Sequence, residues 1–207
     1  MAGLREQQKE QRRQAIAEAA IALFESKGFQ QTRMEDIASS SGVSVPTVFK
    51  YFPSKQAILF EFLKNADRQA LDRARAEVDF SGDPLDAMCL LEEAITVSEL
   101  EVMPVVLWRE ILPLILFSPR SELPATYLKM NEKLVEDIVE FLTEMQQHGM
   151  IRQGADLHTA AFMLNDYSHL QLNRLIRDEP LDWEAHRVNV RATTALVLYG
   201  IADSTQD

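Results

Sequence analysis

Residues 44–52 place hydroxyl, cationic and aromatic side chains close together, in the order SVPTVFKYF. Side chains of these kinds donate hydrogen bonds to phosphates and to base edges, and their apolar parts contact thymine methyl groups. In a helix, Val48 and Phe52 share one face because they are four residues apart. The same geometry turns Thr47, Lys50 and Tyr51 toward solvent. The pattern therefore favours recognition of a nucleic acid.

Two helices are expected before this segment. Apolar residues at helical spacing over 16–24 predict the first, which ends at Gly28 and the apolar Phe29, as a helix with a glycine C-cap does. Thr32 followed by Glu35 has the form of a capping box and predicts a second helix of about two turns. Both would serve to hold the polar segment in place.

A tight turn joins the second helix to the third. It consists of residues 42–44, with the sequence Gly-Val-Ser, and Ser44 can cap the third helix. Pro46 lies in the first turn of that helix, where its missing N–H costs nothing. Two short helices separated by such a turn form a helix-turn-helix, in which the last helix can enter a major groove of DNA.

Residues 16–63 resemble the N-terminal region of the tetracycline-repressor (TetR) family of bacterial transcription regulators. The matching positions are Gly28-Phe29, Thr32, Ile37-Ala38, Gly42-Val43-Ser44, Tyr51-Phe52 and Ser54-Lys55. The resemblance covers about a quarter of the chain, and the rest is similar to the family only in length and helical content. It implies an all-α fold, with a helix-turn-helix DNA-binding domain at residues 1–55 and a ligand-binding and dimerisation domain at residues 56–207.

The resemblance also implies which side chains meet DNA. Those expected to face the duplex are Ser44, Thr47, Phe49, Lys50 and Tyr51, with Val45 beside them at the exposed start of the helix, while Arg33 and Lys55 hold phosphates. Position 49 is often Tyr in the family, and its hydroxyl can bond a phosphate. Phe49 has no hydroxyl, so we expect its ring to lie against a thymine methyl or the sugar backbone.

Charge is distributed unevenly along the chain, whose net charge is −11. Residues 1–55 hold eight Lys and Arg against six Asp and Glu, whereas residues 56–207 hold thirteen against twenty-six. An acidic body is repelled by phosphates, so only the N-terminal face can approach a duplex. Two interpretations stay open for the basic residues of the first helix, a solvated face or an arm that touches DNA: Arg5, Lys9, Arg12 and Arg13.

The rest of the chain is predicted to be helical, since no alternating strand pattern occurs. The expected helices cover roughly residues 54–80, 85–98, 104–117, 156–177 and 182–200, and Pro113 should kink or split the third of these. A further long helix is marked by apolar residues over 134–145 and ends at Gly149. The helices expected over 156–177 and 182–200 carry apolar residues, among them Leu172 and Leu196, on more than one face. A second apolar face left in water is unusual for a monomer, so we expect a homodimer through these helices.

A ligand pocket is expected where Pro104 and Pro113 keep neighbouring helices from packing closely. The candidate lining residues are Met103, Trp108, Arg109, Phe117, Tyr127, Met163 and Tyr167. The same residue types also build ordinary cores, and Arg109 could equally face solvent. The predicted effector is a largely hydrophobic small molecule with one anionic group for Arg109, rather than a sugar or a nucleotide.

Other functions find little support in the sequence. Cys89 stands alone, and His148, His158, His169 and His186 lack the spacing of paired metal ligands, although Asp166 and His169 are three residues apart. We therefore expect no metal, cofactor or catalytic residues. The N-terminus has no apolar signal core and no long apolar run follows, so a cytoplasmic protein without a membrane contact is expected.

The expected function is a repressor that an effector releases from a pseudo-palindromic double-stranded DNA operator. Two alternatives stay open. The first is a ligand-independent activator or DNA-organising protein of the same fold, and the second is an all-helical enzyme.

Overall fold

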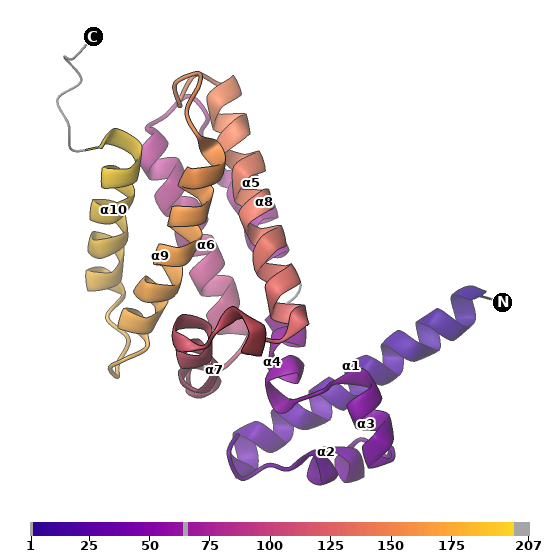
Figure 1. Ribbon diagram of the computed structural model, residues 1–207. Coiled ribbons are helices and arrows are strands. Elements are labelled where there is room, and N and C mark those ends of the chain that lie inside the picture. Colours follow the sequence, from indigo (N-terminus) through magenta and orange to yellow (C-terminus); the bar gives the residue numbers. More distant parts are fainter. Residues whose placement is uncertain (1, 64–65, 201–207) are drawn as a thin grey trace.

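The computed structural model describes residues 2–63 and 66–200, which form α-helices and one 3-10 turn (Figure 1). The elements are α1 (Ala2–Lys27), α2 (Met34–Ser40), α3 (Val45–Tyr51), α4 (Lys55–Leu63), α5 (Ala66–Glu77), α6 (Pro84–Val102), α7 (Val105–Phe117), η1 (Arg120–Glu122), α8 (Ala125–Gln147), α9 (Leu157–Leu175) and α10 (Trp183–Tyr199). The predicted all-α fold is confirmed.

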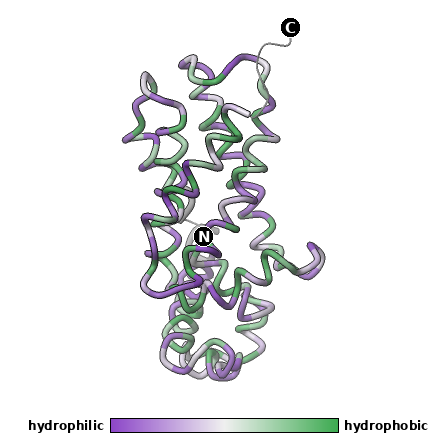
Figure 2. Tube along the Cα trace, turned by 90° about the vertical axis from the view of Figure 1, so that its left-hand side faces the viewer, coloured by the Kyte–Doolittle hydropathy of each residue, from purple (hydrophilic) through white to green (hydrophobic). Residues whose placement is uncertain are grey.

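The helices fall into two parts, which we call the head (α1–α3) and the body (α5–α10). The long helices of the body lie side by side, the head is at one end of them, and α4 leads from one part to the other (Figure 1). Apolar segments of the chain turn toward the inside of both parts, as the hydropathy colouring shows (Figure 2). In the described part of the chain, no helix is long and apolar enough to cross a membrane.

The head is held by local signals close to those expected. Gly28 ends α1 with a φ of +92°, a conformation that a side chain disfavours. The capping box of α2 starts one residue later than predicted, because Asp36 rather than Glu35 accepts a hydrogen bond from the backbone N–H of Arg33, at 2.8 Å. Thr32 is buried, and its hydroxyl donates to the carbonyl of Gly28 at 2.8 Å.

One apolar core continues from the head into the body. In the head, Ile16 of α1 and Val48 of α3 are fully buried, and Leu59 of α4 packs in the same cluster. The cluster then takes in Trp108 of α7 and Tyr127 of α8. A second cluster fills the rest of the body between α5, α6, α8 and α9. Because α4 belongs to the first cluster, its position depends on both parts.

Three predicted elements differ in the structure. The single helix expected over about 54–80 is recorded as α4 and α5, on either side of residues 64–65, which are not among those described. Helix α6 extends to Val102, beyond the expected end near residue 98. Helix α7 is not split at Pro113. That proline is exposed, so water can bond the carbonyl that its missing N–H leaves free.

Candidate DNA interface and effector cavity

The third helix is anchored on one face and open on the other. Val48 and Phe52 have no exposed surface and pack into the core that contains α1. On the outer side, Lys50 is exposed and half of the Phe49 side chain, 49%, faces solvent. The hydroxyls of Ser44 and Thr47 share a hydrogen bond of 2.7 Å at the start of the helix. This outer side therefore offers hydroxyl, ammonium and aromatic groups at the end of the molecule distant from most of the body (Figure 1).

Not every predicted DNA contact lies on that outer side. Val45 and Tyr51 are half-buried and pack against the core, so their side chains flank the open face. Pro46, which was not among the expected DNA contacts, is exposed there. Arg33 is exposed at the start of α2. Of the eight predicted DNA contacts, four are exposed and four are half-buried: Arg33, Ser44, Phe49 and Lys50 are exposed, and Val45, Thr47, Tyr51 and Lys55 are half-buried.

Lys55 has surroundings that the sequence did not predict. Its ammonium donates to the carbonyl of Phe29 at 2.5 Å and to that of Gln30 at 3.4 Å, and it lies 4.5 Å from the centre of the Phe29 ring. Burial lowers the pKa of this lysine, and the nearby carboxylate of Glu110 offsets that effect only in part. Lys55 therefore ties the start of α4 to the turn between α1 and α2, which engages two of its donors.

The basic residues of α1 separate into different roles. Arg12 lines a hollow of about 750 Å³ between α1 and the turn before α3, together with Gln8, Gln11, Ser44 and Thr47. This position favours the DNA-arm interpretation for Arg12, and the glutamines beside it were missed because a lone polar helix face carries no motif. Lys9 pairs with Glu6 at 3.1 Å. The side chain of Arg5 lies outside the described residues.

Arg13 instead joins three helices. Its guanidinium donates to the carboxylate of Glu61 on α4 at 2.5 Å and to the backbone carbonyl of Tyr51 on α3 at 3.4 Å. It also lies 4.7 Å from the centre of the Phe52 ring. The Glu61 hydrogen bond raises the pKa of Arg13, which keeps the group charged. These contacts link the recognition helix to the helix that leads into the body.

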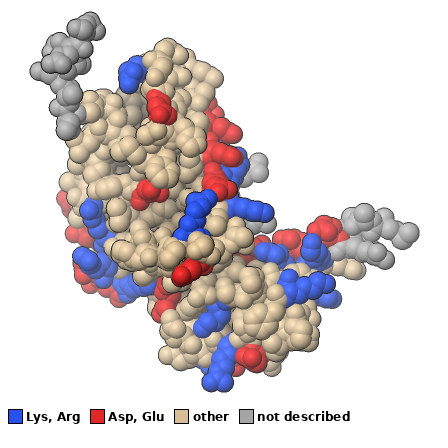
Figure 3. Space-filling view, in the orientation of Figure 1, with Lys and Arg blue, Asp and Glu red and all other residues tan. Residues whose placement is uncertain are grey.

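Basic and acidic side chains occupy different parts of the surface. In Figure 3, blue Lys and Arg side chains are scattered over the head, while red Asp and Glu side chains gather along one edge of the body. The front of the body in this view, which α9 and α10 form, shows few charges. The uneven distribution of charge along the sequence therefore corresponds to an uneven distribution over the surface of the molecule.

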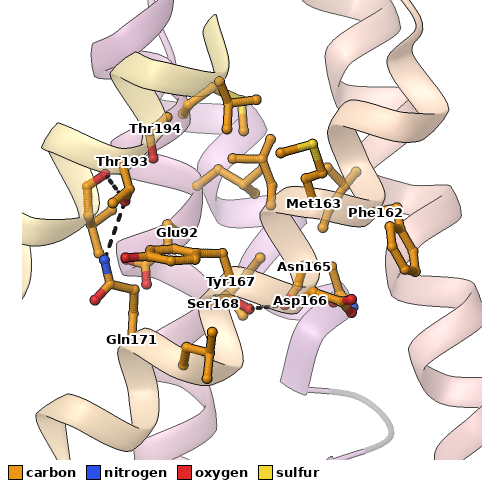
Figure 4. A pocket seen from close by; sticks show the side chains of 18 of the residues that line it. Glu92, Phe162, Met163, Asn165, Asp166, Tyr167, Ser168, Gln171, Thr193 and Thr194 are labelled. Carbon is orange, nitrogen blue, oxygen red and sulfur yellow. Dashed lines mark hydrogen bonds between the residues drawn. The ribbon is translucent and has the colours of Figure 1, made fainter. Parts of the chain in front are cut away.

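A cavity of about 510 Å³ opens in the body between α6, α8, α9 and α10. The side chains that line it are mostly apolar, among them Met88, Leu91, Ile95, Leu134, Ile138, Leu164, Val190 and Val197. Its polar lining includes Glu92, Gln171 and Thr193, and the amide of Gln171 donates to the hydroxyl of Thr193 at 3.3 Å (Figure 4). Cavities of this size and character are typical of small-molecule sites.

Two of the seven nominated pocket residues, Met163 and Tyr167, line this cavity. The structure does not bring the other five to it. Met103, Trp108 and Tyr127 are buried in the core cluster that also contains α4. Phe117 is 81% exposed. Residues of α6 and α10 were missed because apolar helix faces look the same in sequence whether they line a cavity or a core.

Arg109 is also placed away from the cavity. Its Nε donates to the backbone carbonyl of Ile176 and its Nη1 to the carboxylate of Glu179, each at 2.7 Å. The guanidinium is therefore engaged in joining α7 to the end of α9. An anionic effector group at Arg109, as the sequence suggested, does not fit this position.

Cys89 and His169 lie in surroundings that disfavour their charged forms. Cys89 is half-buried and burial raises the pKa of its thiol, which disfavours the reactive thiolate. Burial also lowers the pKa of His169 to about 4. Among the residues that the structure describes, no group of three or more His, Cys, Asp or Glu side chains could hold a metal ion.

Comparisons with known proteins agree with this geometry. Residues 16–62 match the tetR family of bacterial regulatory proteins. The transcriptional regulator RutR of Escherichia coli is 43% identical over 61 residues, which are 30% of this chain and 27% of RutR. The matched stretch therefore spans about a quarter of the length of the curated relatives.

Solved structures are similar over a longer stretch. Thermus thermophilus FadR, a TetR-family transcriptional repressor in complex with lauroyl-CoA, has a TM-score of 0.73 and 22% identity, covering 94% of this chain and 98% of FadR. A FadR from Bacillus subtilis, in complex with stearoyl-CoA, has a TM-score of 0.60 and 22% identity, covering 91% and 99%. At these identities the likeness shows the fold.

Together, the head and the hollow helical body define a helix-turn-helix protein with a separate cavity. Its residues 16–62 carry the family's defining sequence, and nearly the whole chain has the family's fold. Residues 16–62 therefore match the TetR family of bacterial regulatory proteins, and the chain as a whole has the fold of solved TetR-family structures.

Proposed function

We propose that this protein is a transcriptional repressor that binds its operator as a homodimer and releases it when an apolar effector occupies the body cavity. The observation that carries the proposal is the arrangement of α3, which Val48 and Phe52 fix to the core while Phe49 and Lys50 remain exposed to a duplex. Such a helix can read base edges in a major groove. We place its action in the cytoplasm, where bacterial DNA lies.

Dimerisation follows from the outer surface of the last two helices. Six of the nine large hydrophobic side chains found exposed in the described part of the chain belong to α9 and α10: Phe162, Met163, Leu170, Val188, Leu196 and Tyr199. Figure 3 shows that few charges interrupt this face. A second copy of the chain, placed two-fold symmetrically, would cover it. The two recognition helices would then enter major grooves about 34–36 Å apart on a pseudo-palindromic site.

Helix α8 lines the cavity and also contacts α4, so it connects the cavity with the head. Leu134 and Ile138 of α8 line the cavity, and two turns earlier Tyr127 packs against Phe60 of α4, with ring centres 4.8 Å apart. A shift of α8 on effector binding would therefore reach α4 and, through the Arg13 contacts, α3. Coupling between two such sites typically amounts to about 1–3 kcal/mol.

DNA binding and effector binding are assigned to successive segments of the chain. We propose that residues 1–55 contact DNA and that residues 56–207 bind the effector and the second subunit. Helix α4 lies at this boundary and shares its core with both parts. The boundary is therefore a division of function, while folding joins the two sides.

An apolar effector is supported by the cavity itself and by the neighbours. The cavity wall is mainly aliphatic, and two FadR proteins of the same fold are in complex with lauroyl-CoA and stearoyl-CoA, whose acyl chains are apolar. A bound effector would also stabilise the fold, by about 2.7 kcal/mol at a hundredfold excess over its Kd.

A release assay tests the proposal. The protein is mixed with a pool of fluorescent random-sequence duplexes, bound DNA is recovered and amplified, and the enriched duplex is titrated with compounds that raise the melting temperature. Apolar compounds should raise the melting temperature and release DNA together. If only polar metabolites do both, the apolar cavity is not the effector site. If DNA binds but no compound acts, the ligand-independent alternative is favoured.

A further inference from the structure

The charges around the cavity are of one sign. Among the described residues that line it there is no Lys or Arg, and its two ionisable acidic side chains are Glu92 and Asp166. Figure 4 shows Glu92 next to Tyr167 and Gln171, on the side of α9 that faces Thr193, and Asp166 on the opposite side of that helix. Asp166 is exposed. Glu92 is therefore the carboxylate directed into the space.

The side chain of Glu92 is mostly buried and is held by contacts with two neighbouring side chains. It follows Met88 and Leu91 on the face of α6 that forms the cavity floor, and 16% of its side chain is exposed. One carboxylate oxygen accepts a hydrogen bond from the hydroxyl of Thr96 at 3.1 Å. The other lies 3.4 Å from Nε2 of the buried His186. The carboxylate thus has support behind it and open space in front.

Arg174 of α9 contacts two side chains that line the cavity but does not itself line it. Its Nη1 donates to the hydroxyl of Tyr167 at 2.8 Å and to the side-chain oxygen of Gln171 at 3.1 Å. The guanidinium is exposed and lies outside the lining. A ligand carboxylate entering the cavity would lose its hydration and meet Glu92, which is unfavourable on both counts.

We infer that the effector combines an apolar body with a positively charged nitrogen group, such as a primary amine or an amidine, that binds the carboxylate of Glu92. The inference rests on the proposed effector function of this cavity and names the chemical class that the cavity selects. A charge-assisted hydrogen bond to a partly buried carboxylate is stronger than one between neutral groups. The aliphatic wall would hold the rest of the molecule.

Three probes with the same ten-carbon chain isolate the head group: decylamine, decan-1-ol and decanoate. Their dissociation constants are measured by calorimetry with the full-length protein, below the concentrations at which the probes aggregate. Decylamine should bind about tenfold more tightly than either of the others, as expected for one hydrogen bond to a charged group. Glu92→Gln, which keeps the shape and removes the charge, should abolish that preference.

Glu93→Gln is the matched control, because it removes the same charge from the next residue. Glu93 pairs with Arg187 at 2.6 Å and does not line the cavity. Its variant should keep the preference for decylamine, which excludes a general attraction of the acidic protein for amines. Even if Glu92→Gln does not fold, the comparison of the three probes on the unmodified protein shows whether the cavity prefers a cationic head group.

Equal binding of the three probes, or tighter binding of decanoate, would overturn the cationic head group and leave an apolar effector standing. Loss of the preference in Glu93→Gln as well would also overturn it. If none of the probes binds and none releases DNA, both this inference and the effector role of the cavity fail.

Discussion

Arg33 and Lys55 are basic residues of the head with different surroundings. Arg33 is exposed at the start of α2, whereas the ammonium of Lys55 is bonded to two backbone carbonyls. A side chain that neutralises one phosphate contributes about one unit to the slope of log K against log salt concentration. Arg33→Ala should therefore flatten the slope by about one unit, while Lys55→Met should leave it unchanged and lower the melting temperature.

Titrations of a DNA duplex at several salt concentrations provide the measurement. A slope for Lys55→Met that is as flat as that for Arg33→Ala would show that Lys55 binds a phosphate, as the family resemblance implied. The anchoring role that the structure suggests would then be secondary.

His169 makes stability depend on pH. Burial lowers its pKa from 6.5 to about 4, so between these values the unfolded chain binds a proton that the folded chain does not. The free energy of unfolding therefore falls as pH is lowered from about 6.5 toward about 4, by roughly 2–3 kcal/mol from this residue. His169→Gln should lose less stability than the parent protein between about pH 7 and about pH 4.5.

Urea unfolding at both pH values gives the comparison. His158→Gln is the control, since His158 is an exposed histidine of the same helix and its replacement should leave the pH dependence as it is. An equal loss of stability in His169→Gln and the parent would contradict the lowered pKa of His169.

For single residues, the sequence predicted the exposed residues of the recognition helix better than the residues that line the cavity. Lys50 could be placed outward because Val48 and Phe52 fix the phase of a short amphipathic helix, and it is exposed. Thr47 and Tyr51, placed outward by the same argument, are half-buried. Glu92 could not be found in this way. Its role depends on three other helices surrounding one face of α6, and this long-range packing leaves no local pattern.

Helix α4 is the element that joins the head to the body. Phe60 is fully buried and contacts Tyr127 of α8, so replacing it with Ala should cost about 3–5 kcal/mol of stability. Because the core is continuous, the head and body should unfold together in the variant as in the parent. Far-UV circular dichroism and the fluorescence of Trp108 and Trp183 should report one midpoint. Two separate midpoints would mean that the parts fold independently.

The elements themselves were largely predictable. Glycine caps, hydroxyl and Asp caps and apolar periodicity predicted where most helices lie, and the pair expected near residues 156–177 and 182–200 corresponds to α9 and α10. The effect of Pro113 was overestimated, since a proline on an exposed helix face leaves its carbonyl partner to water.

For the whole molecule, the outer face of α10 should hold the dimer together. Val188 on that face is 64% exposed in the single chain, and Val106 on α7 is 56% exposed. A buried glutamate at an interface costs far more than one in water, so Val188→Glu should dissociate the dimer. Val106→Glu, the same change at similar exposure, should remain dimeric. Sedimentation at micromolar concentration distinguishes the two.

A monomeric mass for the unmodified protein in that experiment would contradict the proposed homodimer. Leu196 is 55% exposed and would serve as a second site, whereas Leu172 is 2% exposed and faces inward. A change to Glu at Leu172 would therefore unfold the chain, which makes that position unsuitable as a test of assembly.

The central claim is that two copies of α3 read a symmetric DNA site, and selection from a random duplex pool tests it most directly. The unmodified protein should enrich an inverted repeat whose half-sites lie about one helical turn of DNA, or a multiple of it, apart. Lys50→Ala should alter the preferred bases at the same position in both half-sites, at a cost of about 1–3 kcal/mol for the original sequence. Enrichment of no sequence, or of an identical site by both proteins, would contradict the assignment of α3 as the recognition helix read through Lys50.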